Sequence, residues 1–388
     1  VALIQNAKAR VRRETRVGDV TVRAPSVDVR TVGAGGGSLA FVPELTKALR
    51  VGPESAGAQP GPAAYMKGGT EPTVCDANVV LGYLPSNVQL GGAMAIDKNA
   101  AVAAVKKVAD AMDLTVEEAA EGIIKIVNEA MFGALRLVSV EQGFDPRDFA
   151  LVGFGGAGPL HANALGILTQ AWPTIIPPGP GVLCAYGDAT TVVRDEASKT
   201  FVKLLKNASA VELATVLDEL KHKASTTLIT DGIALSDQEV TYQADVRYTG
   251  QAFQLSIEFT LAELQAQGLE VLKTQFDKQH TQLFTFALEE GHEIVMVRAI
   301  ATASSGELPT MPQGNAANTL DECKLADSQI YFEGQYHPTP IYDRNKMQTD
   351  LQIPGPAIVS EMDSTTVILP GYHAMVDTVG NLLINPAK

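Results

Sequence analysis

The arrangement of apolar and polar positions changes several times along the chain. Residues 1–30 alternate short apolar runs, rich in β-branched side chains, with basic residues, which is typical of strands with one solvated face. From residue 97 onward, apolar positions recur every three or four residues and predict a helix over 98–112. A second helix is predicted after Thr115, because Thr115 and Glu118 form a capping-box pattern ahead of a long apolar face.

A strand, a glycine turn and a helix are predicted in succession over residues 149–168. The run "FALVGF" reads as a fully buried strand, "GGAGP" as a tight turn, and "LHANALGIL" as a helix with Pro159 in its first turn. Such a unit allows a ligand close to the backbone and places amide donors and the positive helix end beside it. The motif is neither GxGxxG nor GxxxxGK[ST], so nucleotide binding and simple close packing both stay open.

The remainder of the chain predicts an α+β segment and then a β-rich one. Ser209 and Glu212 start a capped helix, two strands and a further helix follow, and the strand "EIVMVRAIATA" completes the segment. The polar stretch Ser305–Leu320 is the best internal linker. Three domains are therefore expected, over residues 1–200, 201–320 and 321–388.

The charge balance narrows the classes of partner. Lys and Arg number 30 against 44 Asp and Glu, and the resulting net charge of −14 repels nucleic-acid phosphates and anionic lipids. No apolar run reaches the ~20 residues that cross a bilayer, and the first residues lack the organisation of a signal peptide. We expect a cytoplasmic protein with neither nucleic acid nor membrane as partner.

Cysteine and histidine spacing gives no metal-site pattern. The three cysteines are scattered singly, and the histidines show no HxH or HExxH spacing. We expect a reducing compartment and no metal held by this chain alone.

Polar residues beside the glycine-rich segments are candidates for a site. The loop Gly33–Ser38 offers successive amides and a hydroxyl suited to an anion, or is a bulged loop that needs positive φ. Asp76 could orient substrate, water or Mg²⁺, with Asn78 beside it, or could cap a helix. His161, in the first turn after the glycines, could contact nucleotide or substrate, or be hydrogen-bonded within the packing.

Six segments together resemble one known family. They occur in the order seen in hydantoinase A / 5-oxoprolinase proteins, a group that includes the ATP-binding subunits of acetone and acetophenone carboxylases. The six segments are residues 31–38, 49–84, 138–162, 177–187, 245–255 and 355–372. The resemblance implies an α/β fold: the second lobe of an actin-like (ribonuclease H-like) ATPase, then an α+β domain and a small β-rich C-terminal module.

The resemblance implies an adenosine loop at the glycines after residue 154 and, together with the candidates read from the residues themselves, gives a set of site residues. Asp76 is the catalytic candidate, and Asn78 and His161 are candidates for substrate binding. The cofactor-binding candidates form an adenosine loop and an anion loop, namely Gly155, Gly156, Ala157, Gly158, Gly35, Gly36, Gly37 and Ser38. The expected cofactors are ATP and Mg²⁺.

The implied function is ATP-dependent ring opening of a lactam or hydantoin, in which phosphorylation activates the amide. The family's two Asp-Gly-Gly-Thr-like phosphate loops are not in this sequence, so we expect the chain to be the C-terminal portion of such an enzyme and inactive alone. Expected partners are a small cyclic amide, an upstream N-terminal ATPase lobe and a hydantoinase B-like subunit or domain, in an oligomer. The alternatives are an acetone-carboxylase-like ATP-binding subunit and a non-catalytic scaffold domain.

Overall fold

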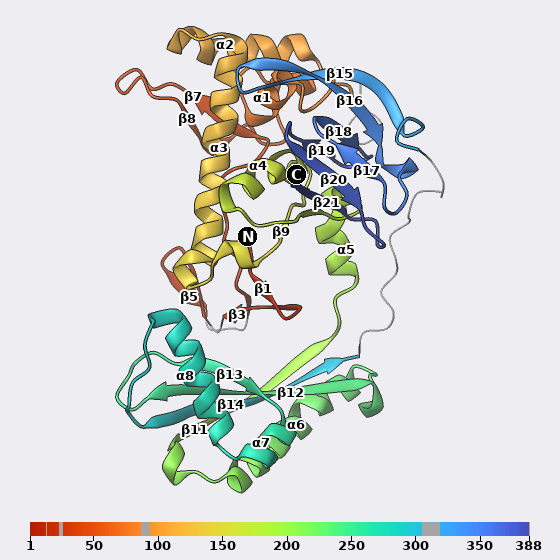
Figure 1. The fold of residues 1–388 in the computed structure, drawn as a ribbon. Coiled ribbons are helices and arrows are strands. Elements are labelled where there is room, and N and C mark those ends of the chain that lie inside the picture. The colour runs from red at the N-terminus through yellow and green to blue at the C-terminus, as the bar shows by residue number, and fades with distance from the viewer. Residues whose placement is uncertain (13, 23–25, 87–93, 305–318, 388) are drawn as a thin grey trace. The chain divides into compact units, whose positions relative to one another are not determined.

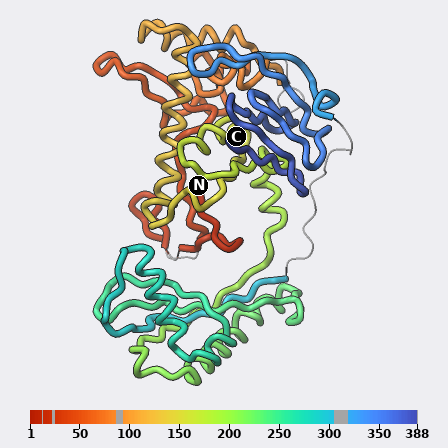
Figure 2. The backbone as a smooth tube through the Cα atoms, in the orientation of Figure 1, coloured from red at the N-terminus to blue at the C-terminus, as the bar shows by residue number. Residues whose placement is uncertain are grey.

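The computed structural model describes residues 1–12, 14–22, 26–86, 94–304 and 319–387. The chain forms two compact units, Val1–Gly187 with Thr310–Lys388, and Asp188–Pro309 (Figures 1 and 2). Both units combine helices with sheets, in agreement with the predicted α/β class. The actin-like lobe stays a prediction, as do the boundaries at 200 and 320.

The helices lie in both units. The α-helices are α1 Val74–Val80, α2 Lys98–Met112, α3 Val116–Val138, α4 Gly158–Thr169, α5 Leu183–Ala189, α6 Ala210–Thr230, α7 Leu261–Gln267 and α8 Glu270–Phe284. Short 3-10 turns are η1 Ala63–Tyr65, η2 Val140–Gln142, η3 Pro146–Asp148, η4 Pro180–Val182, η5 Leu205–Asn207, η6 Leu235–Asp237 and η7 Arg344–Lys346.

The strands of the first unit come from both ends of the chain. The N-terminal set is β1 Ile4–Gln5, β2 Lys8–Ala9, β3 Val11–Arg12, β4 Thr15–Val17, β5 Val20–Val22, β6 Ser26–Val27, β7 Ser38–Phe41, β8 Arg50–Ser55, β9 Leu151–Val152 and β10 Thr174–Ile176. The C-terminal set is β15 Lys324–Phe332, β16 Gln335–Asp343, β17 Gln352–Pro354, β18 Ala357–Ser360, β19 Thr365–Ile368, β20 Tyr372–Val376 and β21 Leu382–Pro386.

Local caps explain where the helices of the first unit begin. The Asp97 side chain accepts hydrogen bonds from the first amides of α2, and Thr115 and Glu118 form the predicted capping box of α3. The predicted apolar face of α3 is buried at Ile123 and Val127, and α1, α2 and α3 pack against one another. Figure 1 shows α3 as the long helix beside which α1, α2 and α4 lie.

The central sheet of the first unit joins distant segments. Its strand order is β17-β20-β21-β10-β9, in which β10 runs parallel to β9 and antiparallel to β21. A second sheet has the order β15-β16-β18-β19, and α4 packs against its strand β19 and against β10. The strands of the C-terminal segment therefore complete the layers on which α4 lies.

The strand before the glycine turn is shorter and more exposed than predicted. Only Leu151–Val152 of "FALVGF" forms a strand, β9, and Val152 and Phe154 are 48% and 47% exposed. The prediction of a fully buried strand was wrong because β9 is the edge of the sheet, so neighbours cover it incompletely.

The N-terminal residues form three small ribbons, as the alternating pattern predicted. The pairs are β1–β2, β3–β6 and β4–β5. In β4–β5, Val17 pairs with Val20, and Val22 lies on the same face two residues further on. All three valines are exposed in the structure.

The second unit is one antiparallel sheet covered by helices. Its strands are β11 Arg194–Leu204, β12 Gln238–Tyr248, β13 Leu255–Phe259 and β14 His292–Ala303, in the order β11-β14-β12-β13. Helix α6 packs against β11 and β14, and α8 against β12 and β13. The predicted helix from Ser209 is confirmed as α6, whereas the predicted helix near 260–280 is two helices separated at Gly268.

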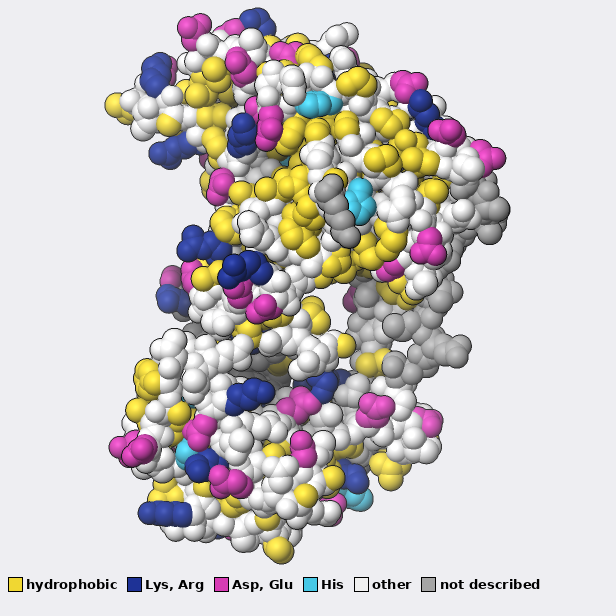
Figure 3. All heavy atoms as spheres, in the orientation of Figure 1, with side chains coloured by type: hydrophobic (Ala, Val, Ile, Leu, Met, Phe, Trp, Pro, Cys, Tyr) yellow, Lys and Arg dark blue, Asp and Glu magenta, His cyan; other side chains and the backbone are white. Residues whose placement is uncertain are grey.

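Three further observations concern surface charge, membrane-spanning helices and the predicted linker. On the face drawn in Figure 3, acidic and basic side chains are interspersed and do not gather in one patch. Within the described ranges, no helix has both the length and the apolar character needed to cross a bilayer. Most of the predicted linker Ser305–Leu320 lies outside the described residues.

Candidate functional site

The turn at Gly155–Gly158, called the glycine turn below, is open at the N-terminus of α4. Gly155 has φ +87°, a conformation that favours glycine. A Cβ atom added at Gly155 or Gly156 would meet no atom within 4 Å. Among the described residues, the amides of Gly156 and Ala157 donate no hydrogen bond, so they can serve a ligand at the positive end of the helix.

The loop Gly33–Ser38 lies directly against the glycine turn. A Cβ atom on Gly36 would be 3.7 Å from the Cβ of Ala157 and 3.9 Å from the Cβ of Cys75. The Cys75 amide also donates to the Gly36 carbonyl at 2.7 Å. The structure thus brings together two segments that the sequence predicted to bind the cofactor but could not place side by side.

Within this loop the members differ in accessibility. Gly35 has no atom within 4 Å of an added Cβ, whereas one on Gly37 would lie 2.8 Å from the Ser55 hydroxyl. The Ser38 hydroxyl accepts a hydrogen bond from the Gly35 amide at 3.0 Å, and Ser38 is 5% exposed. That hydroxyl closes the loop, and its predicted contact with an anion stays a prediction.

Asp76 is a fully buried capping residue in the structure. Its Oδ1 accepts from the Ala64 amide at 2.8 Å. Its Oδ2 accepts from the Thr73 amide at 3.0 Å, the Thr73 hydroxyl at 2.7 Å and the Ala63 amide at 3.3 Å. Burial raises the pKa of Asp76, and these hydrogen bonds oppose the rise. Asp76 therefore joins η1 to the start of α1, which agrees with the alternative that it caps a helix. A catalytic role for Asp76 stays a prediction.

Asn78 and His161 are both buried and each keeps one polar atom without a partner. The Asn78 Nδ2 donates to the Val74 carbonyl at 3.0 Å, and its Oδ1 has no partner among the described residues. His161 Nδ1 donates to Asn128 Oδ1 at 2.8 Å, which leaves Nε2 as an acceptor without a partner in the described part of the chain. Burial lowers the pKa of His161 to about 4, so the imidazole is neutral at pH 7.

Cys75 behaves as a packed thiol. Burial raises the pKa of Cys75 to about 12, with the neighbouring Tyr65 hydroxyl opposing the rise. A thiol of this kind stays protonated at neutral pH and is a poor nucleophile.

A proline-rich loop over residues 177–182, the proline loop, contacts the glycine turn. The Gly155 amide donates to the Pro180 carbonyl at 2.7 Å. Pro180 is buried, and Gly179 before it has φ +56°. The backbone of the proline loop therefore supports the first glycine of the turn.

A third segment, Glu361–Ser364, called the acidic loop, touches both of the others. The Ser364 hydroxyl donates to the Gly156 carbonyl at 3.3 Å. The Asp363 carboxylate accepts from the Val182 amide at 3.2 Å, and Glu361 Oε2 accepts from the Gly179 amide at 3.2 Å. Three segments that were quoted as separate motifs thus form one cluster around the open turn.

A buried ion pair supports this cluster. Arg344 Nη1 donates to Glu361 Oε1 at 2.8 Å, and both side chains are 8% exposed. Arg344 Nη2 donates to the carbonyls of Ile176 at 2.8 Å and Gly380 at 3.0 Å. Burial raises the pKa of Glu361, and the Arg344 charge opposes that rise. Sequence reasoning assigned no role to either residue; Glu361 lay in a quoted motif, but nothing in the sequence marked Arg344.

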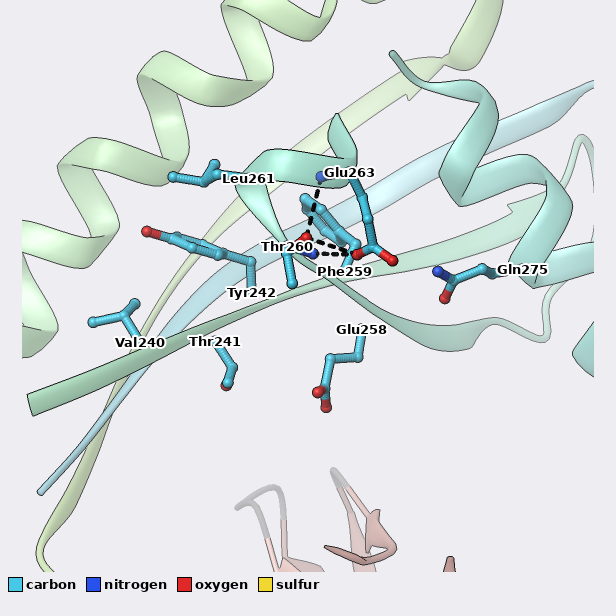
Figure 4. A pocket seen from close by; sticks show the side chains of 9 residues that line it. All are labelled: Val240, Thr241, Tyr242, Glu258, Phe259, Thr260, Leu261, Glu263 and Gln275. Carbon is cyan, nitrogen blue, oxygen red and sulfur yellow. Dashed lines mark hydrogen bonds between the residues drawn. The ribbon is translucent and has the colours of Figure 1, made fainter. Parts of the chain in front are cut away.

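Among the described residues, neither a group of metal ligands nor the pocket of the second unit adds a side chain to this cluster. Within the described ranges, no three His, Cys, Asp or Glu side chains are placed to hold a metal ion. A pocket of about 500 Å³ lies between β12, β13, α7 and α8 (Figure 4). Its Glu263 carboxylate is occupied by the Thr260 amide and hydroxyl in a capping box, drawn as dashed lines. None of the predicted site residues lines this pocket.

Comparison with known proteins covers nearly the whole chain. The family described as Hydantoinase/oxoprolinase matches residues 1–197, and the Hydantoinase/oxoprolinase C-terminal domain matches residues 201–383. The chain is 32% identical to the caprolactamase subunit alpha of Pseudomonas jessenii, over 94% of this chain and 53% of that protein. It is 30% identical to 5-oxoprolinase 1 of Arabidopsis thaliana, over 96% of this chain and 30% of that protein.

Solved structures agree with these matches. The structure described as ATP-dependent caprolactamase from Pseudomonas jessenii superimposes with a TM-score of 0.83 at 32% identity, over 95% of this chain and 54% of that one. A nucleotide-free acetone carboxylase structure superimposes with a TM-score of 0.75 at 22% identity, over the whole of this chain and 56% of that one, which shows a shared fold. The chain spans about half the length of the caprolactamase subunit.

Proposed function

Because the chain belongs to the hydantoinase/oxoprolinase family, we propose that it is part of an ATP-dependent enzyme that opens a small cyclic amide. Two relatives, named as a caprolactamase and a 5-oxoprolinase, support this class of substrate. The structural relative described as an ATP-dependent caprolactamase supports the use of ATP.

The open glycine turn is the observation that carries the proposal. Gly155 and Gly156 leave room for a ligand against the backbone, and the amides of Gly156 and Ala157 are available to it. These features fit a nucleotide, because planar or anionic groups can approach glycine closely and anions are stabilised at the N-terminus of a helix. We assign Gly155, Gly156, Ala157 and Gly158 to this ligand, in the role of an adenosine loop.

The proposed chemistry needs positioning more than a protein nucleophile. When bound, ATP would supply its γ-phosphoryl group to the amide oxygen, with ADP as the leaving group. Water would then attack the carbon of the activated imidate, phosphate would leave, and the C–N bond of the ring would break. The residues of this chain would bind and orient the reacting groups and stabilise charge. The raised pKa of Cys75 is compatible with a reaction without a thiol nucleophile.

The loop Gly35–Ser38 is proposed as the anion-binding neighbour of the nucleotide. Gly36 lies beside Ala157, so a phosphate or a substrate carboxylate at this loop would be close to the turn. Asn78 and His161 each have one polar atom without a partner among the described residues, and we propose that these atoms contact substrate. A neutral His161 would accept a hydrogen bond there and carry no charge at pH 7.

The described residues do not fit a protein-held Mg²⁺. Both oxygens of Asp76, the sequence candidate, are occupied by backbone and hydroxyl donors, and no suitable group of three ligands is found within the described ranges. We therefore assign no step to Mg²⁺ through this chain. A catalytic Asp76 remains a proposal that would require these hydrogen bonds to rearrange.

We also propose partners for the chain. Because it spans about half the length of the caprolactamase subunit, we propose that an N-terminal ATPase lobe carrying the phosphate loops completes the nucleotide site. A hydantoinase B-like subunit or domain, an oligomeric assembly and a cytoplasmic location are proposed on the same family basis.

Nucleotide binding and turnover by the assembled enzyme test the function. Gly156→Val places a side chain in the open turn, and Gly133→Val is the matched control, because an added Cβ at either glycine meets no atom within 4 Å. We expect the Kd for ATP, measured by calorimetry, to rise at least about tenfold for Gly156→Val and to stay unchanged for the control. Equal binding by both variants contradicts a nucleotide at this turn.

Substrate assays then separate the proposed reaction from its alternatives. Phosphate release that depends on lactams or hydantoins supports ring opening. Release that depends on a ketone and bicarbonate identifies the carboxylase alternative, to which the acetophenone carboxylase gamma subunit of Aromatoleum aromaticum, 30% identical over 90% of this chain, corresponds. No nucleotide binding in any assembly would leave a scaffold role.

A further inference from the structure

Arg344 and the acidic loop together hold the proline loop and the residue before it at three points. At the start, Arg344 donates to the carbonyl of Ile176, the last residue before the proline loop. In the middle, Glu361 accepts from the Gly179 amide. At the end, Asp363 accepts from the Val182 amide. The proline loop is thus held by residues about 180 positions further along the chain.

The backbones of the proline loop and the acidic loop are closely packed at Gly181. A Cβ atom on Gly181 would lie 2.5 Å from the Asp363 carbonyl oxygen and 2.8 Å from its carboxylate. Contacts this close mean that the backbone of the proline loop rests directly on the acidic loop. A shift of one loop therefore shifts the other.

The attachments continue to the glycine turn by two routes. The proline loop reaches it through the Pro180 carbonyl, which accepts from the Gly155 amide at 2.7 Å. The acidic loop reaches it through Ser364, which donates to the Gly156 carbonyl at 3.3 Å. The two open glycines are therefore each held by one of the supporting loops.

The Arg344 charge makes Glu361 the centre of this arrangement. The guanidinium is 8% exposed, and Glu361 is the acidic side chain that pairs with it in the described residues. An arginine buried this deeply needs a carboxylate partner, and the fork of Arg344 at the same time binds two backbone carbonyls. Neutralising Glu361 would remove the largest of the carboxylate charges that stabilise Arg344, the others being Asp363 and Asp377.

We propose that Arg344 and Glu361 are positioning residues that hold the proline loop against the glycine turn and so set the turn's affinity for its nucleotide. The C-terminal strands thereby control a ligand that they do not bind themselves. The statement about affinity rests on the proposed function, whereas the statement about the loops does not.

Glu361→Gln is the test variant, because it keeps the size of the side chain and an oxygen for the Gly179 amide but removes the charge facing Arg344. The matched control is Asp245→Asn in the second unit, where Asp245 pairs with Arg298 and both are 2% exposed. Each variant neutralises the carboxylate of a buried arginine pair. Only the first pair has contacts to the proline loop.

Hydrogen exchange of the full chain, followed by mass spectrometry, measures how readily the backbone amides of the glycine turn and the proline loop open. We expect amide exchange over residues 153–158 and 177–187 to rise about tenfold or more in Glu361→Gln and to remain as in the unmodified chain in Asp245→Asn. Exchange unchanged in Glu361→Gln, or raised equally by both variants, overturns the proposal. If Glu361→Gln does not fold, Asp363→Ala, which removes the bond to Val182, is compared in the same way.

Calorimetric titration with ATP and kinetics of the assembled enzyme measure whether the Arg344–Glu361 pair affects the affinity for ATP. We expect Kd and KM for ATP to rise about tenfold in Glu361→Gln with kcat changed less than about twofold, and no change in Asp245→Asn. A faster exchange with unaltered ATP affinity overturns the link to the ligand. If the unmodified assembly does not bind ATP, the proposed function fails, and the exchange comparison still decides whether the loops are held as stated.

Discussion

Both units bury an arginine against a carboxylate, but the two pairs connect different kinds of structure. Arg298 and Asp245 lie on adjacent strands of the second unit's sheet, where Ser256 on the next strand also donates to Asp245. Arg344 and Glu361 connect a 3-10 turn with a loop, with the end of β10 and with the turn between β20 and β21. The same chemistry supports a rigid sheet in one place and a set of loops around an open turn in the other.

The difference concerns what happens when a pair is broken. In the sheet, backbone ladders hold the strands on both sides of Arg298, so loss of the pair lowers stability but leaves the geometry defined. Around the glycine turn, no such ladder joins the proline loop to the acidic loop, so side-chain bonds determine their separation. We therefore expect stability effects from the first pair and ligand effects from the second.

The largest effect is expected for Asp245→Ala. Removing Asp245 leaves the buried Arg298 charge with Glu196, 3.4 Å from its Nε, and deprives Ser256 of its acceptor, so the free energy of unfolding should fall by about 3–5 kcal/mol. Urea denaturation followed by far-UV circular dichroism measures the loss. Faster exchange over residues 153–158 in this variant under native conditions would break the comparison, because it would couple the sheet pair to the glycine turn.

The next effect is a pH dependence located in the first unit. The pKa of His161 is about 4 in the folded chain against an ordinary value of 6.5, so below pH 6.5 the unfolded chain binds a proton that the folded chain does not. Its contribution to stability is complete above pH 6.5 and is lost as the pH falls toward 4, by roughly 3 kcal/mol.

The variant His161→Gln isolates this effect. The raised pKa values of Asp76 and Glu361 act with the opposite sign, since the folded chain then binds protons more readily than the unfolded chain as the pH falls. The difference between the unmodified chain and His161→Gln removes their contribution. Fluorescence of Trp172, the single tryptophan, reports unfolding of this unit, and an equal pH slope in both proteins would contradict the prediction.

A smaller effect is expected for Gly181→Ala, which separates the two loops without altering charge. The added Cβ would press on the backbone of Asp363, and relief of this overlap should cost about 1–3 kcal/mol. Exchange over 153–158 should increase as in Glu361→Gln. Gly187→Ala serves as control, because a Cβ there meets no atom within 4 Å. Slow exchange over residues 153–158 in both variants would show that moving the two loops apart does not affect the glycine turn.

The last prediction compares two serines with matched roles, and the smallest effect of all is expected for Ser364→Ala. Ser364→Ala removes a hydrogen bond to a carbonyl and should cost about 0.5–1 kcal/mol, whereas Ser256→Ala removes one to a buried carboxylate and should cost about 1.5–3 kcal/mol. Chemical denaturation gives both values. If only Ser364→Ala weakens ATP binding, the result supports a ligand effect confined to the loops around the glycine turn. Weaker ATP binding by Ser256→Ala instead would contradict it.

Several elements were predicted well because their signals are local. The capping box of Thr115 and Glu118, the cap of Ser209 and the turn-to-helix transition at Pro159 each involve residues within a few positions of one another. Their physical cause, satisfaction of free amides at the start of a helix, can be read from spacing alone. Asp76 was recognised as a functional or a capping residue, and local spacing could not decide between the two.

The failures and omissions concern contacts between distant residues. The exposure of Val152 follows from the edge position of β9, which depends on the pairing of β10 with a C-terminal strand far along the chain. The role of Arg344 depends on Glu361 and on a carbonyl at Ile176, 168 positions away. No periodicity or motif near Arg344 carries that information.

The sequence by itself determined where helices begin, where glycine allows an open turn, and to which family the order of motifs corresponds. It did so because caps and turns depend on neighbouring residues, and because motif order is a property of the chain. Only the tertiary structure decided that Gly36 lies beside Ala157 and that Glu361 supports the proline loop. The physical reason is that both contacts join residues more than 100 positions apart in the chain, which no local pattern specifies.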